Sequence, residues 1–258
     1  MRQVHALAGE VWRDLLRAVV FLTRIPAPYP DGPAKPLADS LWIAAPVGAA
    51  IGAVGAAVFA VFHALALPPA VAATAAVAAT VWLTGALHED GLADCADGFG
   101  GGFTRARKIE IMRDSRVGTY GAAAMILSLT VRIAALASLA TPAGVFLALV
   151  VAHAVSRSQT LGLLTLFSPA GHAGLGAEAG GPSLGRALVA LLLGLVIAVL
   201  CVGLGAGLLA ALLAWLAAIG VLMLAKHQLG GYTGDVLGTA QQAAEIAALL
   251  VVVAWLTD

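Results

Sequence analysis

The feature that most constrains this chain is an apolar run from Ala187 to Ala225, which contains no charged residue over 39 positions. A helix needs about 20 consecutive apolar residues to cross the hydrocarbon core of a bilayer. The run is therefore long enough for two spans, and we expect the turn between them near Gly203–Gly207. Because 61% of the chain is hydrophobic and only 11% is charged, the sequence predicts an all-α, polytopic membrane protein.

Further apolar segments complete a predicted helical bundle of about seven spans, which forms a single membrane-embedded domain over residues 1–258. The amphipathic segment 9–25 precedes the spans and is expected to lie on the membrane surface, because its charged and apolar residues occupy opposite faces of a helix. The lipid bilayer is thus an expected partner, and a net charge of zero gives no indication of nucleic-acid binding. The other spans are expected at about 41–67, 70–87, 120–140, 145–167 and 239–256.

The distribution of Lys and Arg predicts how the bundle is oriented. Basic residues concentrate in the N-terminal region and in the segment 88–118, and loops rich in Lys and Arg stay in the cytoplasm. The short turns between the other spans carry no charge and are expected outside. With seven spans, the polar loops at 88–118, 168–186 and 226–238 all fall on the cytoplasmic side, which predicts a single active site on that face.

Four of the 14 acidic residues lie within the segment 88–98, directly after an apolar run. On a helix, Asp90, Asp94 and Asp97 share one face. Like charges repel unless a cation lies between them, and carboxylate oxygens suit Mg²⁺ or Mn²⁺. The pattern therefore predicts a divalent-metal site for phosphate chemistry, with a helix end carrying solvated acids as the alternative. Glu89 falls off the shared face, so we expect its loss to have the smallest effect.

A second segment, 108–121, combines arginines with glycines. Arg113 and Arg116 are three residues apart and can reach one anion, and guanidinium groups match the geometry of phosphate oxygens. Gly118 permits close approach of the backbone to a ligand. The alternative is a basic stretch that only sets the topology, but Asp114 favours a site because topology requires no acid there.

Two further places contain candidate residues. The Gly-rich segment 230–238 can hold phosphate at Gly234, and Asp235 beside it can join the metal site, although a flexible loop with one solvated acid is the alternative. Arg157 lies in an apolar span within the sequence Ser-Arg-Ser-Gln and suits a phosphate contact. Arg132, in another span, can either extend to the membrane surface or form a structural pair.

Together these segments resemble the cobalamin synthase family, the adenosylcobinamide-GDP ribazoletransferases. The resemblance covers nearly the whole chain in the order found in the family. Related sequences often carry an acid at the position of Gln242, so we assign no metal role to Gln242. The segments that carry the resemblance are Phe21–Pro26, His88–Gly98, the pattern Met-Arg-Asp-Ser-Arg-x-Gly-Thr-x-Gly that ends at Gly121, and Thr233–Gly238.

The resemblance implies an Mg²⁺-dependent transferase of the bacterial inner membrane that performs the last assembly step of adenosylcobalamin. A hydroxyl of α-ribazole, or of its 5′-phosphate, attacks the phosphorus attached to cobinamide in adenosylcobinamide-GDP, and GMP leaves. Asp97 or Asp235 would accept the hydroxyl proton, while Arg113 and Arg116 hold phosphate oxygens. The other residues expected to bind the ligands are Asp114, Ser115, Gly118, Thr119, Arg157 and Gly234.

Two other protein classes share some of these features. CDP-alcohol phosphatidyltransferases also carry an Asp-rich helix at the membrane edge, but the residues that follow the acids here do not match the spacing of that family. Transporters also place acids and arginines in membrane helices, usually near the midplane and often within internal repeats. In this chain the charges gather at one predicted face, which favours an enzyme.

Overall fold

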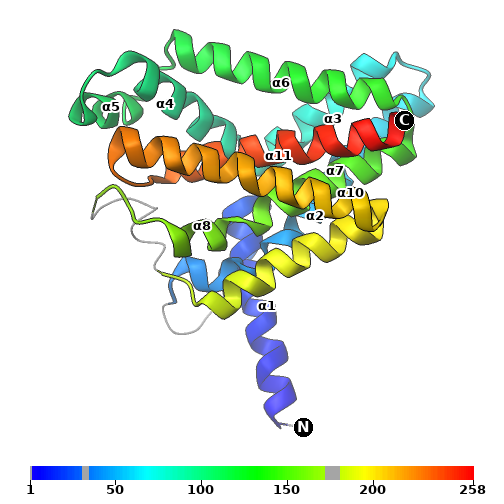
Figure 1. Ribbon diagram of the computed structural model, residues 1–258. Helices are drawn as coiled ribbons and strands as arrows, with labels where there is room; N and C mark the ends of the chain where they lie inside the picture. Colours follow the sequence, from blue (N-terminus) through cyan, green and yellow to red (C-terminus); the bar gives the residue numbers. More distant parts are fainter. Residues whose placement is uncertain (1, 31–34, 172–180) are drawn as a thin grey trace.

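The computed structural model describes residues 2–30, 35–171 and 181–258, and this part of the chain is a bundle of helices (Figure 1). The predicted all-α class is confirmed. The elements are α1 (Arg2–Leu22), the 3-10 helix η1 (Leu37–Ile43), α2 (Ala44–Ala64), α3 (Pro69–Thr84), α4 (Leu87–Gly101), α5 (Arg105–Met112), α6 (Thr119–Leu139), α7 (Pro142–Ser158), α8 (Thr160–Leu166), α10 (Leu184–Leu229) and α11 (Gly234–Thr257).

Several of these helices are long and apolar enough to cross a bilayer. Five meet this condition, namely η1 with α2, α6, α7 with α8, α10 and α11, and the bent pair α3–α4 makes a sixth if it forms one span. The helix α10 is itself a hairpin, because Gly203, with a φ of 83°, interrupts it and the second limb runs back along the first (Figure 1). The predicted turn near Gly203 in the uncharged run is therefore confirmed.

The second predicted span is shorter than expected, because the chain bends by 90° between α3 and α4. Gly85 and Ala86 both adopt left-handed backbone conformations, with φ values of 66° and 56°. The acidic segment 88–98 therefore lies on a separate helix, α4, at about a right angle to α3. The predicted loop 88–118 is mostly helical, since α4 and α5 occupy it. The predicted loop 226–238 shortens to residues 230–233 between α10 and α11.

Small residues allow the long helices to approach one another closely. On α2, a Cβ atom at Gly48 would overlap the backbone of His153 on α7, and one at Gly52 would overlap the backbone of Leu149. Because lipid is as apolar as the helix faces, close van der Waals packing of this kind is a main source of helix association in a bilayer. The packed helices α10 and α11 bury alanines at a spacing of four residues: Ala206, Ala210, Ala214 and Ala218 on α10, and Ala240, Ala244 and Ala248 on α11.

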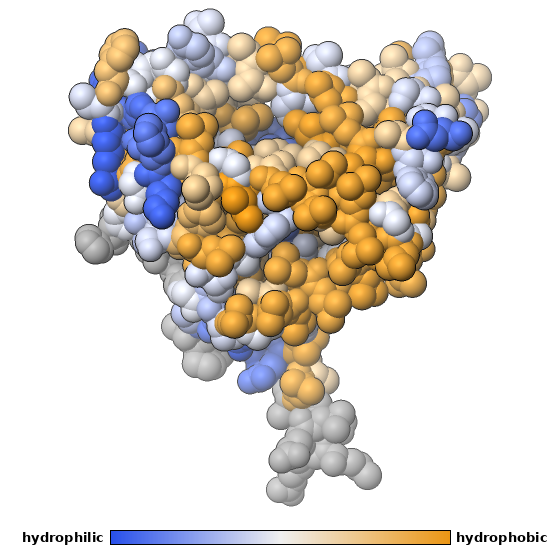
Figure 2. Space-filling model, in the orientation of Figure 1, coloured by the Kyte–Doolittle hydropathy of each residue, from blue (hydrophilic) through white to orange (hydrophobic). Residues whose placement is uncertain are grey.

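The outer surface of the bundle suits a lipid environment. Figure 2 shows apolar side chains over the middle of this view and polar side chains gathered toward the end where α5 lies. In Figure 1, α1 runs across the direction of the long helices, as a helix on the membrane surface would, and it ends at Leu22, slightly before the predicted end. The exposed leucines of α10 are Leu184, Leu188, Leu192, Leu200, Leu204, Leu208, Leu209, Leu212, Leu213, Leu216 and Leu224.

Polar segments that are distant in the sequence meet at one end of the bundle, as the topology predicted. The Ala170 N–H donates to the Tyr232 carbonyl at 2.8 Å, and the Tyr232 N–H donates to the Ser168 carbonyl at 3.1 Å. Arg105 on α5 donates to the Ala170 carbonyl. These bonds join the segment after α8 to α5 and to the short connection before α11. Residues 172–180 of the predicted loop after α8 lie outside the described residues.

Candidate functional site

The structure places eight of the twelve predicted site residues around two cavities, and Asp94, Arg113, Ser115 and Thr119 line neither of them. The first, termed the acidic cavity, has an apolar wall formed mainly by leucines and a polar side formed by His88, Asp90, Arg157, Thr160, Asp235 and Gln241, with Gly234 beside them. The second, termed the α5 cavity, is lined by residues that include Asp97, Arg107, Glu110, Asp114, Arg116 and Gly118.

Close packing of α4 against α11 brings two acids into the acidic cavity. A Cβ atom at Gly91 would overlap the backbone of Asp235, and the Thr239 hydroxyl donates to the Gly91 carbonyl at 3.0 Å. This contact explains why Asp90 and Asp235 line the same cavity. Asp94, which is half-buried one turn further along α4, is close enough to both carboxylates to experience their negative charge.

These carboxylates have the chemistry of a site for a hard divalent cation. Within the described ranges, Asp90, Asp94 and Asp235 form no ion pair with Lys, Arg or His. Among the same residues, no group of three or more His, Cys, Asp or Glu side chains is already arranged to hold a metal ion. The predicted ligand set of Asp90, Asp94 and Asp97 is therefore not preassembled in this structure.

Asp97 is turned toward the start of α6. The Gly118 N–H donates to Oδ2 of Asp97 at 2.7 Å, and the Gly121 N–H donates to Oδ1 at 2.9 Å. The first N–H groups of a helix lack helical partners and carry partial positive charge, so a carboxylate is stabilised there. A Cβ atom at either glycine would overlap this carboxylate. Gly118 and Gly121 thus make room for Asp97, a contact that the sequence pattern did not predict.

The sequence predicts that loss of Glu89 has the smallest effect of the four acids, but the structure places Glu89 in a buried ion pair. Glu89 is only 6% exposed, and its Oε1 accepts a hydrogen bond from Nη1 of Arg132 at 2.8 Å. The other terminal nitrogen of Arg132 lies 2.8 Å from Oε1 of Glu245. Of the two alternatives for Arg132, pairing inside the bundle is the one that the structure shows.

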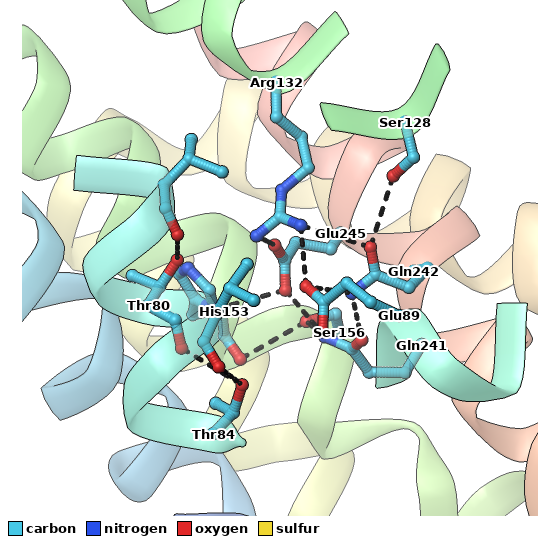
Figure 3. A network of polar contacts seen from close by, with 12 residues as sticks. Thr80, Thr84, Glu89, Ser128, Arg132, His153, Ser156, Gln241, Gln242 and Glu245 are labelled. Carbon is cyan, nitrogen blue, oxygen red and sulfur yellow. Dashed lines mark hydrogen bonds and ion pairs between the residues drawn. The ribbon is translucent and has the colours of Figure 1, made fainter. Parts of the chain in front are cut away.

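Glu245 lies at the centre of a buried polar network that joins α4, α6, α7 and α11 (Figure 3). Its Oε2 lies 3.1 Å from Nη1 of Arg157 and 3.1 Å from Nδ1 of His153, and it accepts a hydrogen bond from the Gln241 amide at 2.7 Å. The two buried glutamates of the network balance the charges of its two buried arginines. Because an unpaired buried charge is unfavourable, the network fixes Arg157 where that residue lines the acidic cavity.

The arginines of the second predicted motif do not converge on one anion. Arg116 is 85% exposed and pairs with Asp114, with Nη2 2.6 Å from Oδ2. The hydrogen bonds from Arg116 lower the pKa of Asp114 to about 2. Arg113, Ser115 and Thr119 are exposed, and none of these three lines the acidic cavity or the α5 cavity.

The sequence pattern also failed to connect Gln241, Gln242 and Glu245 with the site. Gln242 is buried and donates to Oε1 of Glu89 at 3.3 Å, which places it in the same network. A signal was present, because an ionisable residue inside an apolar span requires a partner. Glu245 is an acid in the last span, and Arg132 and Arg157 are bases in earlier spans.

Comparison with known proteins gives a consistent result. A family model described as Cobalamin-5-phosphate synthase matches residues 14–253. An adenosylcobinamide-GDP ribazoletransferase of Mesorhizobium japonicum is 44% identical over 247 residues, which cover 94% of this chain and 93% of that protein. The enzyme of the same name from Xanthobacter autotrophicus is 47% identical over 250 residues, which cover 92% of this chain and 94% of that protein. No solved structure matches the chain. The chain therefore belongs to the cobalamin-5-phosphate synthase family.

Proposed function

We propose that the chain transfers the adenosylcobinamide phosphoryl group from adenosylcobinamide-GDP to a ribose hydroxyl of α-ribazole or α-ribazole 5′-phosphate. The acceptor oxygen forms a bond to the phosphorus next to cobinamide, and the bond from that phosphorus to GMP breaks. The product is adenosylcobalamin or its 5′-phosphate, which makes this the last step of cobalamin assembly. The observation that carries the proposal is the acidic cavity, where Asp90, Asp235 and Arg157 come together in a chain of this family.

Arg157 is suited to hold phosphate oxygens of the donor. Its Nη1 is held by Glu245 and by His153, whose Nδ1 lies 2.8 Å away, and the residue also lines the acidic cavity. A guanidinium that is fixed before the substrate arrives loses little entropy when it binds. Phosphoryl transfer depends mainly on positioning and on neutralisation of charge, and Arg157 supplies both.

Asp235 is the better placed of the two candidate bases. It lines the acidic cavity, and its Oδ2 has one side-chain contact, with the Thr233 hydroxyl at 3.3 Å. Both oxygens of Asp97, in contrast, accept backbone N–H groups from the start of α6. A general base must have a free oxygen within hydrogen-bond reach of the proton that it removes. We therefore assign acceptance of the hydroxyl proton to Asp235.

The proposal includes Mg²⁺, with Asp90 and Asp94 as the residues that would hold it. Mg²⁺ is commonly bound through one or two carboxylates together with substrate phosphates, so a preassembled cage is not required. Asp90 is exposed and Asp94 is half-buried, which leaves both side chains free to turn toward an ion. Bound there, Mg²⁺ would neutralise charge on the diphosphate and on the departing GMP.

We further propose that the site faces the cytoplasm from the inner membrane. The support is the basic end of the bundle near α5, because basic residues beside spans remain on the cytoplasmic side. The residues concerned are Arg105, Arg107, Lys108, Arg113 and Arg116.

The test uses purified protein in lipid nanodiscs supplied with adenosylcobinamide-GDP, α-ribazole and Mg²⁺, with GMP quantified over time. We expect GMP release that requires the acceptor and stops when a chelator removes the metal. No GMP, or GMP release at the same rate without acceptor, would contradict the proposal. Glu110→Gln, a change in an exposed ion pair of α5, is the control and should behave as the unaltered protein.

A further inference from the structure

We propose that a third cavity, termed the arginine cavity, is a phosphate-binding subsite for the acceptor substrate. Its ligand is a phosphate monoester, the 5′-phosphate of the α-ribazole acceptor. The inference rests on the proposed function and adds the charged group by which the acceptor is recognised. The cavity encloses about 430 Å³, within the size range of small-molecule sites. The polar residues that line it are Arg17, Thr23, Arg24, Tyr29 and Thr84.

Arg17 gives the cavity a positive charge that the protein compensates incompletely. The residue is 6% exposed, and its Nε has no hydrogen-bond partner in the described part of the chain. Asp14 is its acidic neighbour at 3.6 Å, but the Asp14 carboxylate already accepts from Lys35 at 2.7 Å and from two neutral donors. A buried guanidinium with an unpaired N–H is unfavourable, and phosphate oxygens supply the acceptors that it lacks.

Arg24 adds a second guanidinium that is held in place. Its backbone N–H donates to the Leu83 carbonyl at 2.7 Å, and its side chain packs on Gly85, where a Cβ atom would overlap it. Gly85 also has a φ of 66°, so both the space and the backbone conformation require glycine. Within the described residues Arg24 forms no ion pair, and the described lining of the cavity contains no Asp or Glu.

The arginine cavity adjoins the acidic cavity. Phe21, Leu37 and Leu87 line both of them, and Leu87 begins the helix α4 that carries Asp90. The acceptor has a ribose hydroxyl that must reach the acidic cavity and a phosphate on the same sugar. Two guanidinium groups beside a shared apolar wall match that pair of groups, since arginine recognises phosphate through paired N–H donors.

The experiment measures GMP release by Arg24→Gln with α-ribazole and with α-ribazole 5′-phosphate, in nanodiscs of zwitterionic lipid. We expect the KM for the phosphorylated acceptor to rise about ten- to hundred-fold, the effect of losing a charged hydrogen bond, while the KM for α-ribazole stays at the wild-type value. Arg24→Lys keeps a positive charge, so the KM for the phosphorylated acceptor should rise less than in Arg24→Gln. Arg13→Gln, on α1 but outside the cavity, is the matched control and should leave both KM values unchanged.

An equal rise in KM for both acceptors would overturn the inference. A defect that appears only when the nanodiscs contain anionic lipid would also overturn it, because the bound phosphate would then belong to a lipid headgroup. Failure of the proposed function is distinguishable, since the unaltered protein would release no GMP with either acceptor. Calorimetric titration with α-ribazole 5′-phosphate decides the matter without turnover: we expect weaker binding to Arg24→Gln, and equal binding by both proteins would contradict the subsite.

Discussion

Nη1 of Arg157 lies 3.1 Å from Oε2 of Glu245, and this ion pair joins the buried network to the acidic cavity. The other oxygen of Glu245 lies 2.8 Å from Arg132, so one carboxylate compensates arginines from two helices. Glu245 does not line the cavity. In the proposed reaction it is therefore a positioning residue, which acts through Arg157.

Glu245→Gln should weaken both the fold and donor binding. Removing one partner of a buried pair leaves uncompensated charge, so we expect a loss of about 3–5 kcal/mol in the free energy of unfolding. We also expect the KM for adenosylcobinamide-GDP to rise more than kcat falls, because Arg157 would lose its fixed position. Thermal unfolding in detergent and steady-state kinetics measure the two effects.

The matched control for this change is Glu110→Gln. Glu110 pairs with Arg107 at 2.8 Å, but both side chains are more than half exposed. Removing an exposed pair should change stability by less than about 1 kcal/mol. If Glu245→Gln were as stable and as active as this control, the network would not position Arg157.

Substitution of the adjacent acids Glu89 and Asp90 should affect different properties, stability for Glu89 and activity for Asp90. Glu89→Gln should lower stability by about 3 kcal/mol, because it removes the buried partner of Arg132. Asp90→Asn should leave stability within about 0.5 kcal/mol of the wild type, since Asp90 is exposed, but should lower GMP release by more than about tenfold as a metal ligand is lost. Thermal unfolding and GMP release, measured on the same preparations, separate the effect on stability from the effect on activity. A Glu89→Gln protein as stable as the wild type, together with a destabilised Asp90→Asn protein, would contradict both assignments.

The contact between Asp97 and the start of α6 predicts coupling between two substitutions. Gly121→Ala places a methyl group against the Asp97 carboxylate, and Asp97→Asn removes its charge. Each should cost about 1–2 kcal/mol of stability, the scale of a helix-capping interaction. Because they act on one contact, the double variant should lose less than the sum of the two. Thermal unfolding of the wild type, the two single variants and the double variant measures the coupling, and strict additivity would contradict an interaction between the two positions.

The fold could be predicted to a large extent because bilayer spans depend on local composition. The uncharged run from Ala187 to Ala225 required two helices, and the break occurs at Gly203. The bend between α3 and α4 could not be predicted, because it depends on consecutive left-handed residues, one of which is Ala86. Ala rarely adopts that conformation, so the sequence favoured a longer span.

The site could be predicted only in part, because the sequence reveals local helix geometry but not contacts between distant residues. Helical periodicity correctly placed Asp90 and Asp94 near each other on α4, but it says nothing about which distant residues face that helix. The sequence does not reveal the ion pair of Glu89, because its partner Arg132 lies 43 positions away. The sequence predicts a ligand contact at Gly118, yet the atoms that lie against it in the structure belong to Asp97. Partners of this kind are set by tertiary packing.

The ion pair of Asp114 and Arg116 predicts that Asp114 causes no change in the rate of GMP release with pH near neutrality. Hydrogen bonds from Arg116 lower the pKa of Asp114 from an ordinary value of 3.8 to about 2. A carboxyl whose pKa is lowered on folding contributes stability above its unfolded pKa, and this contribution is lost as the pH falls through its folded pKa. Asp114 therefore stays ionised at neutral pH. The rate of Asp114→Asn relative to the wild type should be constant from about pH 6 to pH 9, and an inflection in that ratio would contradict the assignment.

We have proposed that Asp90, which lines the acidic cavity, and Asp94, one turn further along α4, hold Mg²⁺, while Asp97 anchors the start of α6. The Mg²⁺ concentration that gives half-maximal GMP release tests this most directly. We expect Asp94→Asn to need at least about tenfold more Mg²⁺ than the wild type, or to lose activity altogether, and we expect folded Asp97→Asn to keep the wild-type requirement. Full activity of Asp94→Asn at the wild-type Mg²⁺ requirement would contradict the claim.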